Sequence, residues 1–69
     1  MREIVRDALG EHVHLTGENT EEGHIFFILH NPEWPRPMGF GVEEEAWYSY
    51  TREGKIDLLR SEVERLTND

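Results

Sequence analysis

The chain has 69 residues, with fifteen acidic and seven basic side chains, a formal net charge of −8 and no cysteine. This length allows one small domain, residues 1–69, and it excludes a two-domain enzyme, a nucleotide-binding α/β sheet and a barrel. The cysteine count excludes a disulfide scaffold and a thiolate metal site, and the acidic balance argues against direct binding of nucleic acid.

The first expected elements are a helix and a strand. Residues 2–9 carry apolar side chains at the spacing of one helical face, and Gly10 is a suitable stop, so we expect a short helix. Residues 11–16 alternate between polar and apolar side chains, which predicts a half-buried strand. Residues 17–23 contain no apolar side chain, so we expect a loop that joins a hairpin.

Two further strands follow in the middle of the chain. Residues 24–30 are apolar on both faces over most of their length, which predicts a central strand. All three prolines fall within residues 31–39, which predicts a stiff, extended loop that carries Trp34. Residues 40–51 alternate again and predict a third strand. A helix through residues 43–48 is the alternative, and the sequence leaves this choice open.

The last element is a helix. We expect a turn at residues 52–54, and residues 55–67 carry an apolar stripe at helical spacing. The fold class is therefore α+β, a single small domain of the order α-β-β-β-α. In it a three-stranded antiparallel meander is packed on one face by two helices. The other sheet face is left to solvent or to a partner.

Neither a signal peptide nor a membrane span is expected. The chain begins with a charged, helix-like segment, and its longest apolar run, residues 25–29, is far shorter than the ~20 residues of a membrane span. These features predict a cytoplasmic protein with no membrane partner.

The negative charge is concentrated in the middle of the chain. Residues 7–51 hold nine acidic side chains against a single base, Arg36, which gives −8, whereas the two ends together sum to zero. Such asymmetry favours a partner surface, and general solubility or salt adaptation is the alternative.

The histidines and the absence of catalytic motifs bear on chemistry. The spacing of His12, His14 and Glu18 resembles the first motif of cupin metal sites, although the second motif is missing, so a metal site is one alternative. His24 and His30 are predicted on the same outward face, where all four histidines could also form an ordinary exposed or pH-sensitive surface. We find no nucleophile motif and no phosphate-binding loop, so we expect neither an enzyme nor a cofactor.

The glutamate clusters are the strongest indication of function. Carboxylates along a small sheet can imitate the phosphates of DNA, and a complementary potential would steer them into a basic groove. Tryptophan is frequent among residues that dominate binding. The predicted partner-binding residues are Glu18, Glu21, Glu22, Glu43, Glu44, Glu45, Glu33 and Trp34.

The chain resembles phage-encoded DNA-mimic inhibitors of the anti-CRISPR class, which share no common sequence motif, in its length and in the acids Glu18, Glu21, Glu22, Glu43, Glu44 and Glu45. The resemblance implies that the partner is a CRISPR effector subunit and that the protein acts in the host cytoplasm. Another basic nucleic-acid-binding protein, such as a restriction enzyme or a glycosylase, fits the same features. The alternative is a structural or regulatory interaction module, antitoxin-like or homodimeric, that uses the sheet face and the Trp34 loop. We expect a monomer or a weak homodimer.

Overall fold

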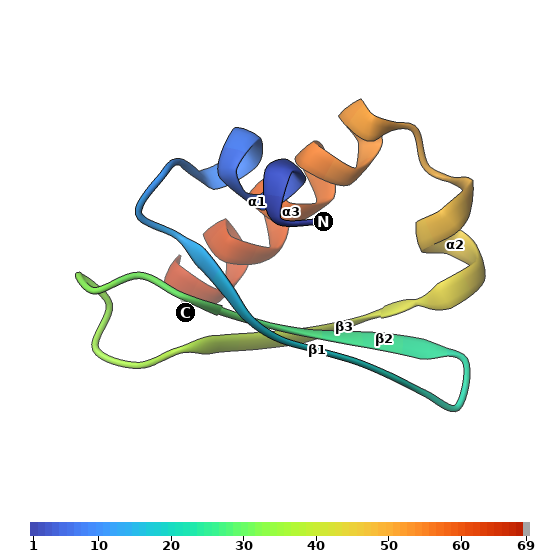
Figure 1. The fold of residues 1–69 in the computed structure, drawn as a ribbon, viewed down its shortest axis with the longest axis horizontal. Helices are drawn as coiled ribbons and strands as arrows, with labels where there is room; N and C mark the ends of the chain where they lie inside the picture. Colours follow the sequence, from blue (N-terminus) through green and yellow to red (C-terminus); the bar gives the residue numbers. More distant parts are fainter. Residues whose placement is uncertain (69) are drawn as a thin grey trace.

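The computed structural model describes residues 1–68, in which six elements follow one another. They are α1 (Arg2–Leu9), β1 (His14–Glu21), β2 (His24–His30), β3 (Met38–Glu43), α2 (Glu44–Ser49) and α3 (Arg52–Asn68). The strands form one antiparallel sheet in the order β1-β2-β3, and the helices lie on one side of it (Figure 1). The predicted α+β class and three-stranded meander are confirmed, with one helix more than expected.

Both predicted helices are present, and the second is longer than predicted. α1 ends before Gly10, whose φ of 96° lies in the left-handed region that glycine adopts without strain. α3 begins at Arg52, so the predicted turn at residues 52–54 is wrong. The Thr51 hydroxyl oxygen accepts a hydrogen bond from the Gly54 N–H at 3.1 Å. This side-chain cap satisfies a free N–H of the first helical turn and sets the helix start.

The first strand differs from the prediction. β1 occupies His14–Glu21, so the predicted strand at residues 11–16 begins too early and the predicted loop at residues 17–23 is mostly strand. Only Glu22 and Gly23 form the turn, with φ of 51° and 79°. Positive φ at both central residues is typical of a tight two-residue hairpin. The polar residues of β1 are extended because they pair with β2. The sequence of residues 17–21 by itself does not reveal this pairing.

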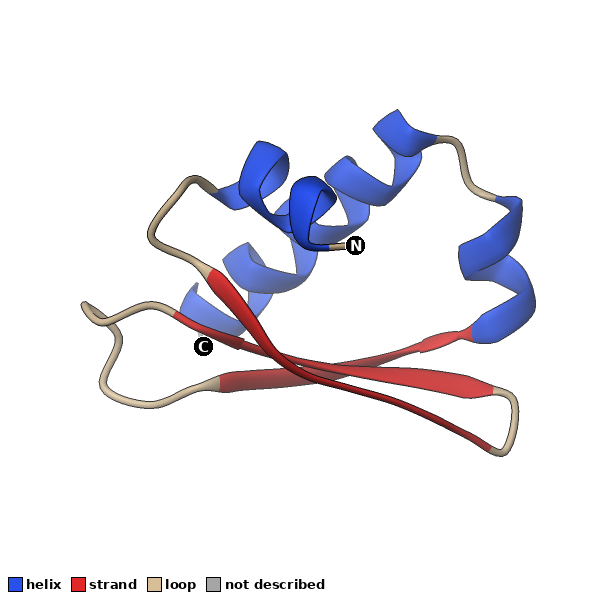
Figure 2. Ribbon diagram, viewed as in Figure 1, coloured by secondary structure: helices blue, strands red, loops and turns tan. Residues whose placement is uncertain are grey.

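The third predicted strand, residues 40–51, is divided between two elements. β3 begins earlier, at Met38, and ends at Glu43, and α2 follows at once, so the helix alternative for residues 43–48 is correct (Figure 2). In the sheet register Glu43 lies opposite His24, the first residue of β2. A longer β3 would have no partner strand, whereas a helix turns Trp47 back over the sheet.

The core lies between the helices and one face of the sheet. The fully buried Phe27 ring is 5.7 Å from the Phe40 ring and 5.1 Å from the Trp47 ring, measured between centroids. Val5 of α1 and Leu59 of α3 close this core from the helix side. Its other members are Ala8, Val13, Ile25 and Leu29. The opposite face of the sheet is left uncovered by the three helices (Figure 1).

Candidate functional site

Five of the predicted partner-binding residues gather at one end of the sheet. The Glu44 N–H donates a hydrogen bond to the Gly23 carbonyl at 2.9 Å, so the start of α2 is tied to the β1–β2 turn. We name the residues gathered here the acidic end: Glu21, Glu22, Glu43, Glu44 and Glu45. Glu44 is half-buried and the other four are exposed.

A cross-strand row forms the sheet part of the acidic end. Glu21 on β1 and Glu43 on β3 both lie opposite His24 on β2. Side chains at directly opposed positions are about 5 Å apart at Cβ, so the imidazole is flanked by a carboxylate on each side. His24 Nδ1 lies 3.2 Å from the Glu22 carbonyl oxygen, and its ring is 6.3 Å from the Phe26 ring. The turn therefore holds this imidazole in place.

Glu18 lies on β1 but not in the acidic end. The strand register shifts between Leu15 and Gly17, which marks a β-bulge at Thr16. After the bulge Glu18 lies opposite Phe27, a core residue, so its side chain is on the helix side of the sheet, where it is exposed. Its position is thus separate from the row formed by Glu21, His24 and Glu43.

Glu33 and Trp34 lie at the opposite end of the sheet. Both are in the β2–β3 loop, where Asn31 accepts hydrogen bonds from the Glu33 N–H through its side chain and from the Trp34 N–H through its carbonyl. Trp34 is half-buried and packs against the core. The structure therefore does not join these two residues to the acidic end, and the predicted eight-residue site is divided.

The structure also separates the residues of the metal alternative. His14 lies opposite His30 at the sheet end distant from His24, and His12 precedes the strand. His14 and Glu18 are on opposite faces, because the bulge lies between them. Within residues 1–68 no three histidine or acidic side chains are placed to hold a metal ion.

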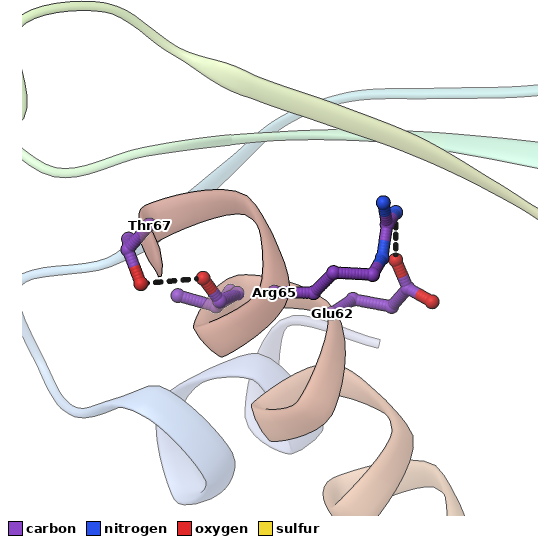
Figure 3. A network of polar contacts seen from close by, with 4 residues as sticks. Glu62, Arg65 and Thr67 are labelled. Atoms are coloured by element: carbon purple, nitrogen blue, oxygen red, sulfur yellow. Dashed lines mark hydrogen bonds and ion pairs between the residues drawn. The ribbon is translucent and has the colours of Figure 1, made fainter. Parts of the chain in front are cut away.

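The acidic end has no salt bridge among the described residues. Ion pairs lie instead on the helix side, between Arg52 and Asp7 and between Arg65 and Glu62, the latter at 2.6 Å on successive turns of α3 (Figure 3). None of the three strands contains lysine or arginine. The carboxylates of the acidic end therefore keep their charge uncompensated by the protein itself.

Four exposed apolar or aromatic side chains were not predicted as site residues. Phe26 and Ile28 are 44% and 46% exposed on β2, Tyr48 is exposed on α2, and Tyr50 is exposed directly after that helix. The sequence could have indicated Phe26 and Ile28, since a strand that is apolar on both faces needs other elements of structure to cover both faces. Only one face of β2 is covered by helices.

No family model, curated protein or solved structure matches this chain. Within the described residues, none of the helices has the length and apolar character to cross a membrane.

Proposed function

We propose that the protein is an inhibitor that binds a basic nucleic-acid-binding protein through its acidic end, in place of DNA phosphates. The observation that carries the proposal is the gathering of five glutamates from β1, the β1–β2 turn, β3 and α2 at one end of the fold, with no salt bridge to any of them among residues 1–68. A CRISPR effector subunit is one partner of this kind.

Electrostatics supports the choice of partner. A duplex presents one phosphate charge per about 1.7 Å of its axis, and proteins that bind it neutralise several of these charges with lysine and arginine. Such a basic groove attracts uncompensated carboxylates by the same forces, and the encounter is faster at low salt. Tyr48 shares one face of α2 with Glu44 and is 68% exposed, so it adds an aromatic contact beside the charges.

The proposed site does not include all of the residues that the sequence predicts. Glu33 and Trp34 are excluded from it because they lie at the other end of the sheet, and Glu18 is on the helix side. The proposed binding residues are the acidic end and Tyr48.

The experiment compares three immobilised proteins: the wild type, an acidic-end variant with Glu22, Glu44 and Glu45 changed to Gln, and a control. The control carries Glu11→Gln, Asp57→Asn and Glu64→Gln, which remove the same charge from exposed positions elsewhere. Each column receives proteins eluted from a duplex-DNA resin. We expect capture by the wild type and the control, release by added duplex, and at least a tenfold loss with the acidic-end variant.

Retention by all three columns to the same extent would contradict the proposal, as would a wild-type column that retains nothing. Circular dichroism of each variant confirms that a loss of capture does not reflect unfolding.

A further inference from the structure

The side of the sheet away from the helices carries an apolar ridge. We name this side the outer face; its residues are His14, Gly17, Asn19 and Glu21 on β1, His24, Phe26, Ile28 and His30 on β2, and Gly39, Gly41 and Glu43 on β3. Antiparallel sheets that face water usually present polar side chains there. Here the two central positions of the central strand are occupied by exposed Phe26 and Ile28.

Glycines on the neighbouring strands shape this ridge. A Cβ atom at Gly41 would lie 2.8 Å from Cε1 of Phe26, and one at Gly17 would lie 3.1 Å from Cδ1 of Ile28. Phe26 therefore leans over β3, and Ile28 leans over β1. Because the two side chains lean in opposite directions, Ile28 leaves a low area over Gly39 on β3, and Phe26 leaves only the short side chain of Asn19 beside it on β1.

We propose that the outer face binds a second copy of this chain, face to face. The two-fold axis lies in the plane of the interface, perpendicular to the strands, and passes opposite Phe27. Phe26 of one copy then lies beside Ile28 of the other and over its Gly39, and Ile28 lies beside Phe26 and over the short side chain of Asn19. Two stacked sheets are about 10 Å apart and align within about 30°, so single layers of side chains can interdigitate in this way.

The charge distribution selects this orientation. His14 and His30 lie at one end of the outer face, and Glu21 and Glu43 at the other. An axis perpendicular to the strands places His14 opposite Glu21 of the second copy, twice in the dimer, and an imidazole N–H can donate to that carboxylate. An axis parallel to the strands would interdigitate the ridge equally well, but it would bring the glutamates of both copies together.

Pairing through a sheet edge is disfavoured by the edges themselves. β1 carries a bulge at Thr16 and a charged residue, Glu18, and β3 follows directly on Pro37. Bulges, charges and prolines are the features that prevent edge-to-edge association. The outer face has no comparable protection at its centre.

The size of the face predicts a weak, reversible dimer. Three strands about 4.8 Å apart and about seven residues long, at about 3.3 Å per residue, give a footprint of roughly 330 Å² per copy. Stable complexes bury about 800 Å² per partner. Glu21 and Glu43 belong to both the outer face and the acidic end, whereas Glu22, Glu44 and Glu45 lie outside the outer face. Changes at Phe26 or Ile28 therefore leave the acidic end intact, and the variant with Glu22, Glu44 and Glu45 changed leaves the outer face intact, so failure of the dimer and failure of the inhibition can be told apart.

Sedimentation equilibrium from about 10 μM to 1 mM tests the dimer. We expect the average mass of the wild type to rise from 8.2 kDa toward twice that value. Phe26→Thr and Ile28→Thr each place a β-branched residue, which suits a strand, and remove one side chain of the ridge, and each should weaken association at least tenfold. Tyr50→Ala removes an aromatic side chain of similar exposure, 43%, outside the face and should leave association unchanged.

A charge exchange tests the orientation. His14→Glu places a glutamate opposite Glu21 of the second copy and should weaken association, and the double variant His14→Glu, Glu21→His should restore it. A mass of 8.2 kDa at every concentration would overturn the proposal. So would association that the ridge variants leave unchanged, or a double variant that associates no better than His14→Glu.

Discussion

At Glu22 the backbone adopts a conformation that glycine or asparagine would adopt more easily. Its φ is 51°, in the left-handed region that costs most residues about 1–2 kcal/mol, and Gly23 follows at 79°. Asn-Gly is the preferred pair for such a turn. The hairpin tip therefore carries a glutamate at a conformational cost, which fits a role for this side chain in binding.

Glu22→Asn should raise the free energy of unfolding by about 1 kcal/mol, because asparagine tolerates the left-handed region. Urea denaturation measures the change. Glu11→Asn is the control, since it removes the same charge at an exposed residue whose φ is negative. An equal gain in both variants would show that charge, and not the turn, sets the effect.

Among the elements, α2 depends most on a single side chain. Trp47 is buried and packs on Phe27. The centroid of its ring lies 5.2 Å from the ammonium nitrogen of Lys55. Trp47→Ala should cost about 3–5 kcal/mol, close to the whole stability of so small a domain, and should therefore lower the helical circular dichroism signal sharply. Tyr48→Ala, the next position along the helix, should shift the urea midpoint little. Equal effects would mean that α2 is not held by Trp47.

Local pattern was sufficient for some elements and not for others. The apolar stripes of α1 and α3 and the apolar run of β2 are local, and all three were predicted. β1 and α2 depend on the sheet register: residues 17–21 are extended because they face β2, and α2 begins because β2 offers no partner beyond Glu43.

The candidate site also depends on both local sequence patterns and contacts between distant residues. The acidic end requires the tight turn at Glu22 and the bond between Glu44 and Gly23, neither of which the sequence specified. The predicted topology alone would have separated Glu33 and Trp34 from the acidic end, because a meander places successive loops at opposite ends of a sheet. The exposed ridge of Phe26 and Ile28 needed the finding that no helix covers the outer face.

Across the whole molecule, the basic side chains are concentrated on two helices. Six of the seven basic residues are on α1 and α3, the strands have none, and the acidic end stands apart from the helix ion pairs. Repulsion among the glutamates opposes folding and is screened by salt. The free energy of unfolding should therefore rise by on the order of 1 kcal/mol between low and moderate NaCl.

Urea titrations at about 10 mM and 300 mM NaCl measure this rise, which should be smaller in the acidic-end variant with Glu22, Glu44 and Glu45 changed to Gln. Stability that falls with salt would mean that the helix ion pairs outweigh the repulsion at the acidic end.

The most direct test of the acidic end as a substitute for DNA is competition for one site. A fluorescent duplex is bound to a protein captured as described above, and its anisotropy is followed as this protein is added. We predict complete displacement of the duplex by the wild type, weaker displacement as salt increases, and at least tenfold weaker displacement by the acidic-end variant. A complex in which the protein binds while the duplex stays bound would contradict the account.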